Sequence, residues 1–292
     1  MHFADALVER IRRVRTPLCL GLDPRWEWLP SSIRQRYGHT ETGRARAYEE
    51  FCFRVLELAC HRVAAIKVQS AFFEACGPEG LRALRHVILA AQRRGMLVIL
   101  DAKRGDIAST ADAYAEALYH VYNADAATVN PYLGNDSLAP FLKLAQREER
   151  GLFILVRTSN VGACDYQELI CGNKKLYQWV ASQVEQWAQA TRGQFGYGLI
   201  GAVVGGTDAS ALVSLRQQMP TTFFLIPGYG AQGASLESIR AAFDQSGNGA
   251  IVNASRSILY AAPAEAEDWE TYVEAALVNS AKELADAVGW GR

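Results

Sequence analysis

Short, continuous apolar runs recur along the 292-residue chain and alternate with longer segments in which apolar residues repeat every three or four positions. We predict β-strands at the runs, because unbroken apolar character is typical of strands buried on both faces of a parallel sheet. The segments 80–95 and 173–193 show helical periodicity instead. The predicted strands are residues 16–23, 63–69, 96–102, 125–130, 152–158, 199–205, 221–227 and 249–255.

Repeated β–α units in a chain of this length predict an α/β fold, a (β/α)8 TIM barrel formed by one domain over residues 1–292. Helices at residues 1–16 and 265–288 would cap this domain at its N- and C-terminal ends. A doubly wound sheet is the alternative. It would usually carry a GxGxxG turn after its first strand, where this chain has LGLDPRW.

Composition narrows the class of protein. The chain has 30 basic and 31 acidic residues, without the basic excess typical of nucleic-acid-binding proteins. No apolar stretch approaches the 18 residues of a membrane span, and the N-terminal pattern lacks the apolar core of a secretory signal. The six cysteines include no CxxC pair and the histidines no HExxH motif. We therefore expect a cytoplasmic protein with free thiols and no metal site.

Charged residues follow the predicted strands at their carboxyl ends, where TIM barrels hold their functional groups. Asp23 follows the first strand, Lys67 lies on the second, and Asp101 and Lys103 end the third. Strand alternation predicts that Asp101 and Lys103 point to the same side. A structural ion-pair network at the barrel mouth is one interpretation. We expect Asp106 to lie near the same four side chains. We therefore favour an active site, because charged side chains are rarely buried together unless they have a function.

Two further stretches predict a phosphate site. PGYGAQGAS, residues 227–235, follows the seventh strand, and ASRSI, residues 254–258, begins the helix after the eighth. These two loops, with exposed amides and a helix N-terminus, commonly bind phosphate in TIM barrels. Arg256 adds a bidentate donor suited to phosphate. The alternative is a pair of ordinary turns with a surface arginine.

The segment DAKRGDIAST, residues 101–110, resembles the D-x-K-x-x-D signature of the orotidine 5'-phosphate decarboxylase family. The order and spacing of the other motifs resemble the longer bacterial subgroup of that family. Departures are small (SNVG, VVGGT and Ala234) and change no charged position. The other motifs that carry the resemblance are GLDP at 21–24, IKVQ at 66–69, VNPYLGNDSL at 129–138, VRTSN at 156–160, PGYGAQG at 227–233 and SRSI at 255–258.

The resemblance implies cofactor-free decarboxylation of orotidine 5'-phosphate to UMP, in the pathway of pyrimidine synthesis. It makes Lys67, Asp101 and Lys103 the charged cluster of one subunit, with Asp106 entering from the partner subunit of a homodimer. Lys103 would donate the proton to pyrimidine C6. This agrees with the chemistry, because a fixed ammonium at C6 would stabilise the carbanion that loss of CO₂ leaves there.

The resemblance also implies the residues that bind the substrate. Asp23, together with Lys67 of the cluster, would hold the ribose hydroxyls, and Thr110 of the partner subunit would lie nearby. Ser159 would contact the pyrimidine. Gln232 would bridge the base and the phosphate, and Arg256 would hold the phosphate.

Three other functions remain open from the sequence. A related Mg²⁺-dependent enzyme could use a similar motif, but it would want a further carboxylate at the end of the second strand, where this chain has Lys67. A Schiff-base aldolase could use Lys103 or Lys67 as its amine. The third alternative is a catalytically silent nucleotide-binding protein, against which the intact set of charges argues.

Overall fold

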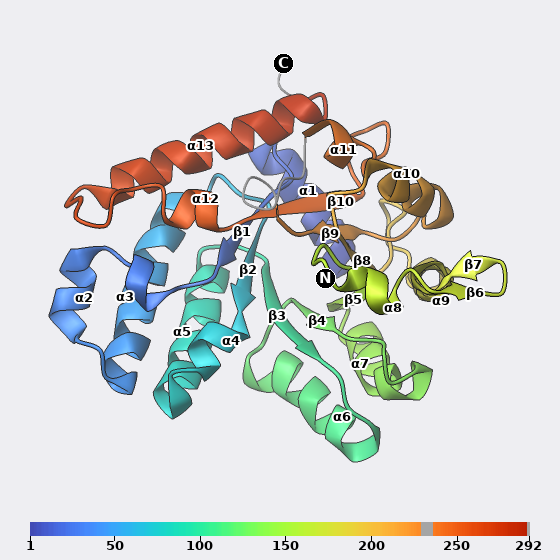
Figure 1. Ribbon diagram of the computed structural model, residues 1–292, viewed down its shortest axis with the longest axis horizontal. Coiled ribbons are helices and arrows are strands. Elements are labelled where there is room, and N and C mark those ends of the chain that lie inside the picture. The colour runs from blue at the N-terminus through green and yellow to red at the C-terminus, as the bar shows by residue number, and fades with distance from the viewer. Residues whose placement is uncertain (229–235, 291–292) are drawn as a thin grey trace.

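In the computed structural model, which describes residues 1–228 and 236–290, parallel strands close into a barrel surrounded by helices (Figure 1). The barrel strands are β1 (Leu18–Leu22), β2 (Ala65–Gln69), β3 (Val98–Arg104), β4 (Ala126–Val129), β5 (Gly151–Arg157), β8 (Ile200–Val204), β9 (Phe224–Ile226) and β10 (Ala250–Ala254). Their order around the barrel is β1-β10-β9-β8-β5-β4-β3-β2. The prediction of a TIM barrel is confirmed.

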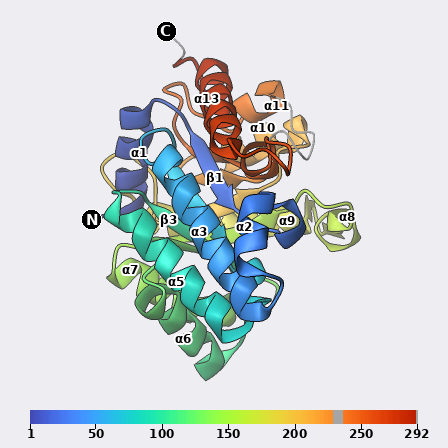
Figure 2. The same cartoon turned by 90° about the vertical axis from the view of Figure 1, so that its left-hand side faces the viewer.

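Helices form the outer layer, and α3 packs against both α5 and α13 (Figure 2). The helices are α1 (Phe3–Val14), α2 (Ser31–Tyr37), α3 (Glu41–Ala59), α4 (Ser70–Glu74), α5 (Gly77–Arg93), α6 (Ala108–Glu116), α7 (Asn135–Arg147), α8 (Ala163–Tyr166), α9 (Leu176–Ala190), α10 (Ala209–Gln218), α11 (Leu236–Arg240), α12 (Arg256–Leu259) and α13 (Trp269–Ala287). Short turns of helix lie at η1 (Trp26–Trp28) and η2 (Ala117–Val121). None of the helices described here is long and apolar enough to span a membrane.

The apolar runs identified in the sequence form the buried core of the barrel. Every residue of β1, β8 and β10 is buried, because helices cover the outside of the barrel and the side chains of other strands fill its inside. At the amino end of the barrel, the ring of Phe3 from α1 packs edge-to-face against Phe153. A Cβ atom at Gly151 would collide with Phe3, so this position requires glycine.

The long connection between β5 and β8 carries an extra hairpin, β6 (Ile170–Cys171) paired antiparallel with β7 (Lys174–Lys175). The predicted helix 173–193 therefore begins only at Leu176, since the two lysines before it belong to the hairpin. Glu168 joins this insertion to the barrel through ion pairs with Arg157 at the end of β5 and with Lys175. The insertion is thus fixed beside the carboxyl end of the barrel.

Candidate active site

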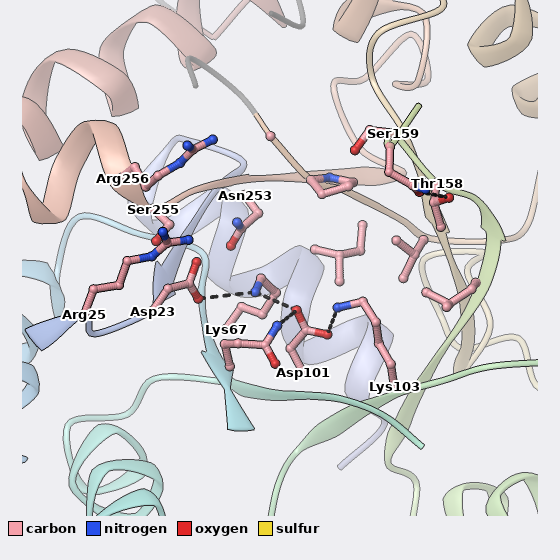
Figure 3. Close-up of a pocket in the computed structure, with 17 residues that line it drawn as sticks. Asp23, Arg25, Lys67, Asp101, Lys103, Thr158, Ser159, Asn253, Ser255 and Arg256 are labelled. Carbon is pink, nitrogen blue, oxygen red and sulfur yellow. Dashed lines mark hydrogen bonds and ion pairs between the residues drawn. The ribbon is translucent and has the colours of Figure 1, made fainter. Parts of the chain in front are cut away.

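A cavity of about 500 Å³ opens at the carboxyl ends of the barrel strands (Figure 3). Its volume falls within the range of small-molecule sites. It has walls from both halves of the barrel, with β1, β2 and β3 facing the loops after β5 and β10. Of the residues predicted for the site, the structure brings six together on its lining: Asp23, Lys67, Asp101, Lys103, Ser159 and Arg256.

Asp101 is the centre of the charged group, with its side chain only 6% exposed. Its Oδ2 accepts hydrogen bonds from Lys67 Nζ at 2.7 Å and from Gln69 Nε2 at 3.1 Å. Its Oδ1 accepts from Lys103 Nζ at 2.6 Å and from Thr128 Oγ1 at 2.9 Å. Four donors on one carboxylate fix its orientation, and two of them are charged.

The charges alternate in sign along the floor of the cavity. Lys67 lies between Asp101 and Asp23, whose Oδ1 is 3.7 Å from Lys67 Nζ. Burial would raise the pKa of Asp101, but the charges and hydrogen bonds of Lys67 and Lys103 lower it well below its usual value. Burial would lower the pKa of Lys67, but Asp101 and Asp23 raise it above the ordinary lysine value. Asp101 and Lys67 are therefore charged at neutral pH.

Lys103 reaches the cavity in a different way from the one predicted. The register of β3 against β4 shifts between Leu100 and Arg104, and Lys103 has a left-handed backbone with φ of 46°. Lys103 and Asp101 point into the same cavity, as predicted, but an irregular backbone and not a regular strand brings Lys103 there. A left-handed conformation costs a non-glycine residue about 1–2 kcal/mol. The backbone N–H of Lys103 donates to Thr128 Oγ1 at 2.9 Å, which supports this conformation.

Asp106 and Thr110, which were also predicted for the site, do not line the cavity of this chain. Asp106 lies in the loop after β3, where its Oδ1 accepts a hydrogen bond from the backbone N–H of Ile107 at 2.8 Å. The N-cap of α6 is the next residue, Ile107. Thr110 lies in the exposed first turn of that helix. Gln232 falls outside the described residues, as does most of the predicted glycine-rich loop.

The wall formed by β1 and β10 contains polar groups that the sequence analysis did not assign. Arg25 Nε, Asn253 Oδ1 and Ser255 Oγ are buried, and none has a hydrogen-bond partner among the residues that the structure describes. A Cβ atom at Gly21 would lie 2.9 Å from Asn253 Oδ1 and from Ser255 Cβ, so this glycine keeps the wall open. Buried polar groups are nearly always paired, and unpaired ones in a cavity are available to a ligand.

The sequence contains a signal that could have identified Thr128 and Asn253 as residues at or beside the site. Each is a single polar residue within an otherwise apolar strand, close to the carboxyl end where the site lies. Within residues 1–228 and 236–290, no group of three or more His, Cys, Asp and Glu side chains is arranged to hold a metal ion. The charged side chains of the cavity are instead lysines and arginines facing two aspartates.

Comparison with known proteins gives a consistent result. A family model described as orotidine 5'-phosphate decarboxylase / HUMPS family matches residues 16–272. The orotidine 5'-phosphate decarboxylase of Rhodopirellula baltica is 41% identical over 97% of this chain and 99% of its own length. That of Clostridium kluyveri is 38% identical, over 93% of this chain and 92% of its own.

Solved structures agree with these relatives. The structure of Leishmania donovani OMP decarboxylase superposes with a TM-score of 0.80 and 38% identity, and the match covers 99% of both chains. Sequence, fold and the charged lining of the cavity thus lead to one assignment. The chain belongs to the orotidine 5'-phosphate decarboxylase / HUMPS family.

Proposed function

We propose that this protein converts orotidine 5'-phosphate to UMP and CO₂ in pyrimidine synthesis, without a cofactor. The observation that carries the proposal is the ammonium of Lys103, held 2.6 Å from the buried Asp101 at the cavity that these two residues of the family's signature line. The family and its curated relatives support the reaction. We also infer a cytoplasmic location, in which the six free cysteines would stay reduced.

The reaction needs a site for the electron pair that CO₂ leaves behind. When the bond between C6 and the carboxylate breaks, the pair stays on C6, and Lys103 Nζ stabilises it electrostatically and then transfers a proton to it. The product is UMP, and the neutral amine must recover a proton. The side chain of Lys103 is 43% exposed, so water can return that proton.

Asp101 keeps Lys103 oriented, and Lys67 in turn compensates the charge of Asp101. Because these donors are fixed before the substrate arrives, the site needs little reorganisation during the reaction. We assign the ribose hydroxyls to Asp23 and Lys67, and the pyrimidine to Ser159. These assignments are supported by the position of Asp23, Lys67 and Ser159 on the lining of one cavity.

At the other end of the substrate, we assign the phosphate to Arg256, which starts α12 directly after β10. This arginine lines the same cavity as the charged cluster, on the wall that ends β10. Gln232 would bridge the base and the phosphate, by resemblance to the family.

We propose a homodimer in which Asp106 and Thr110 of each chain complete the site of the other. The loop after β3 that carries Asp106 is accompanied by exposed apolar side chains, of which Ile107 is 55% exposed, Leu133 47% and Tyr132 77%. Exposed apolar side chains that lie together are typical of a surface that another protein covers. A two-fold axis through this face would bring both carboxylates into the opposite cavities.

The experiment that tests the function is a spectrophotometric assay of the purified protein with orotidine 5'-phosphate, with and without EDTA. We expect UMP and CO₂ to form at the same rate in both. Activity lost in EDTA and restored by Mg²⁺ would favour the metal-dependent relative. Covalent trapping of a carbonyl substrate by borohydride would favour the aldolase, and UMP binding without turnover the silent nucleotide-binding protein.

A further inference from the structure

Arg25 is an unassigned cation in the cavity, on the loop directly after β1 (Figure 3). Its guanidinium carbon lies 4.5 Å from the centre of the Trp28 ring and 5.3 Å from that of Phe72. Its backbone N–H donates to Tyr260 Oη at 2.7 Å, and that hydroxyl donates to the carbonyl of Asp23 at 2.9 Å. Both the backbone and the side chain of Arg25 are therefore held in position.

Arg25 differs from the other ring-stacked arginines near the barrel mouth. Arg104 stacks on a tyrosine and pairs with Glu74, and Arg157 stacks on a tyrosine and pairs with Glu168 and an aspartate. No carboxylate of the described residues forms an ion pair with Arg25, and its Nε is buried without a hydrogen-bond partner. An arginine stays charged in proteins, so within residues 1–228 and 236–290 this partly buried guanidinium has no anion that compensates its charge.

The net charge of the cavity lining favours an anionic ligand at the wall formed by β1 and β10. Arg25, Lys67, Lys103 and Arg256 bring four positive charges to the lining, against the two negative charges of Asp23 and Asp101. The cluster around Asp101 accounts for both lysines, because each of them bonds that carboxylate. Arg25 lies just after the end of β1, and Arg256 lies just after the end of the adjacent strand β10.

We propose that Arg25 is a second phosphate-binding residue, which holds the 5'-phosphate of the nucleotide together with Arg256. The assignment rests on the proposed function, because it requires a nucleotide monophosphate in the cavity. A phosphate dianion can accept a bidentate contact from a planar guanidinium. Trp28 and Phe72 hold that plane before the ligand binds, so little side-chain freedom is lost on binding.

The test compares the affinities of UMP and uridine, measured by titration calorimetry, for the wild type, R25Q and R25K. We expect R25Q to weaken UMP binding about tenfold to a hundredfold, since a hydrogen bond to a charged group is lost, and to leave uridine binding within about twofold. R25K keeps the charge but not the planar fork, so its UMP affinity should lie between those of R25Q and the wild type. The matched control is R12Q, because Arg12 also stacks on a ring, that of Phe195, but lies on the exposed side of α1.

Unchanged UMP affinity in R25Q would overturn the proposal, as would equal losses for UMP and uridine, which would mean that Arg25 acts through the fold. If R25Q does not fold, R25K alone tests the proposal, which then requires that R25K loses affinity for UMP but not for uridine.

The role of Arg25 and the proposed reaction can fail separately. A wild type that decarboxylates orotidine 5'-phosphate while R25Q binds UMP normally rejects only the role of Arg25. A wild type without turnover, in which R25Q selectively loses UMP, rejects only the reaction.

Discussion

Thr128 Oγ1 donates a hydrogen bond to Asp101 Oδ1 at 2.9 Å and accepts one from the backbone N–H of Lys103 at the same distance. Thr128 is fully buried on β4, so the neighbouring strand fixes both the carboxylate and the left-handed backbone of the lysine. A single hydroxyl thus sets the geometry of the pair to which we assign the chemistry. Thr128 is a positioning residue, since it does not line the cavity and acts through Asp101 and Lys103.

We expect T128V to lower kcat about tenfold to a hundredfold, because small displacements of a reacting group have effects of this size. Its KM and its affinity for UMP should change little, since the binding residues are left in place. T128S keeps the hydroxyl and should restore most of kcat. Steady-state kinetics of the two variants make the comparison. Equal values of kcat for T128V and T128S would mean that the hydroxyl has no positioning role.

K103A should lower kcat by a factor of about 10²–10⁴, the usual contribution of a general acid, while UMP still binds. The physical reason is that the ammonium acts on the charge that develops in the transition state. Turnover and UMP titration give the two quantities. The control is K143A, which removes an exposed lysine from α7. Retention of near-wild-type kcat in K103A would contradict the role of Lys103.

The shared site can be tested with mixed dimers. Inactive K103A and inactive D106N subunits, unfolded together and refolded, should regain roughly a quarter of wild-type activity. Half of the dimers are then mixed, and each mixed dimer has one intact site and one doubly altered site. Subunit exchange must be verified with differently tagged chains. Exchange without recovery of activity would show that each site is built from a single chain.

R256A should reduce kcat/KM for orotidine 5'-phosphate by at least about tenfold, because a charge-assisted contact to phosphate is worth about 1.5–3 kcal/mol. For the phosphate-free nucleoside orotidine, the same substitution should change kcat/KM little. Parallel assays with both substrates test this. If both lose the same factor, Arg256 does not bind the phosphate.

The lowered pKa of Asp101 predicts a pH-dependent contribution to stability. An unfolded aspartate has a pKa of about 3.9, so the carboxylate stabilises the fold fully above about pH 5. That contribution is lost as the pH falls towards the lower pKa of the folded state. D101N should therefore lower the free energy of unfolding by about 3–5 kcal/mol at pH 7, and the difference from wild type should shrink below about pH 4.

Urea denaturation from pH 3 to pH 7 measures this difference. The control D136N alters an exposed aspartate in α7 and should change the free energy of unfolding by less than about 0.5 kcal/mol. If the free energy of unfolding of D101N lies below that of the wild type by the same amount from pH 3 to pH 7, the ionised form of Asp101 is not what stabilises the fold.

The barrel and the charges at its mouth could be predicted from the sequence, because both depend on local patterns. Continuous apolar runs identify buried parallel strands, and the fold then places Asp23, Lys67 and Asp101 at one end. The backbone of Lys103 could not be predicted in this way. Its left-handed conformation depends on a contact with Thr128, which is 25 residues away along the chain.

Arg25 escaped prediction for a similar reason. Its position depends on two rings, of which Phe72 lies on α4 after the second strand. No local pattern indicates that no carboxylate in the described part of the chain pairs with this arginine. The hairpin between β5 and β8 was also missed, since β6 and β7 have two residues each and show no strand periodicity. Local sequence patterns do not reveal contacts between distant residues or strands of only two residues.

The alternating charges of Asp23, Lys67, Asp101 and Lys103 also restrict how such a site can change in evolution. Replacing Lys67 or Asp101, the two buried members, leaves a neighbouring charge without its partner in a place that water does not easily reach. A single substitution at either buried residue therefore lowers stability unless its partner changes as well. A new chemistry is more accessible through the loops that surround these four residues than through the residues themselves.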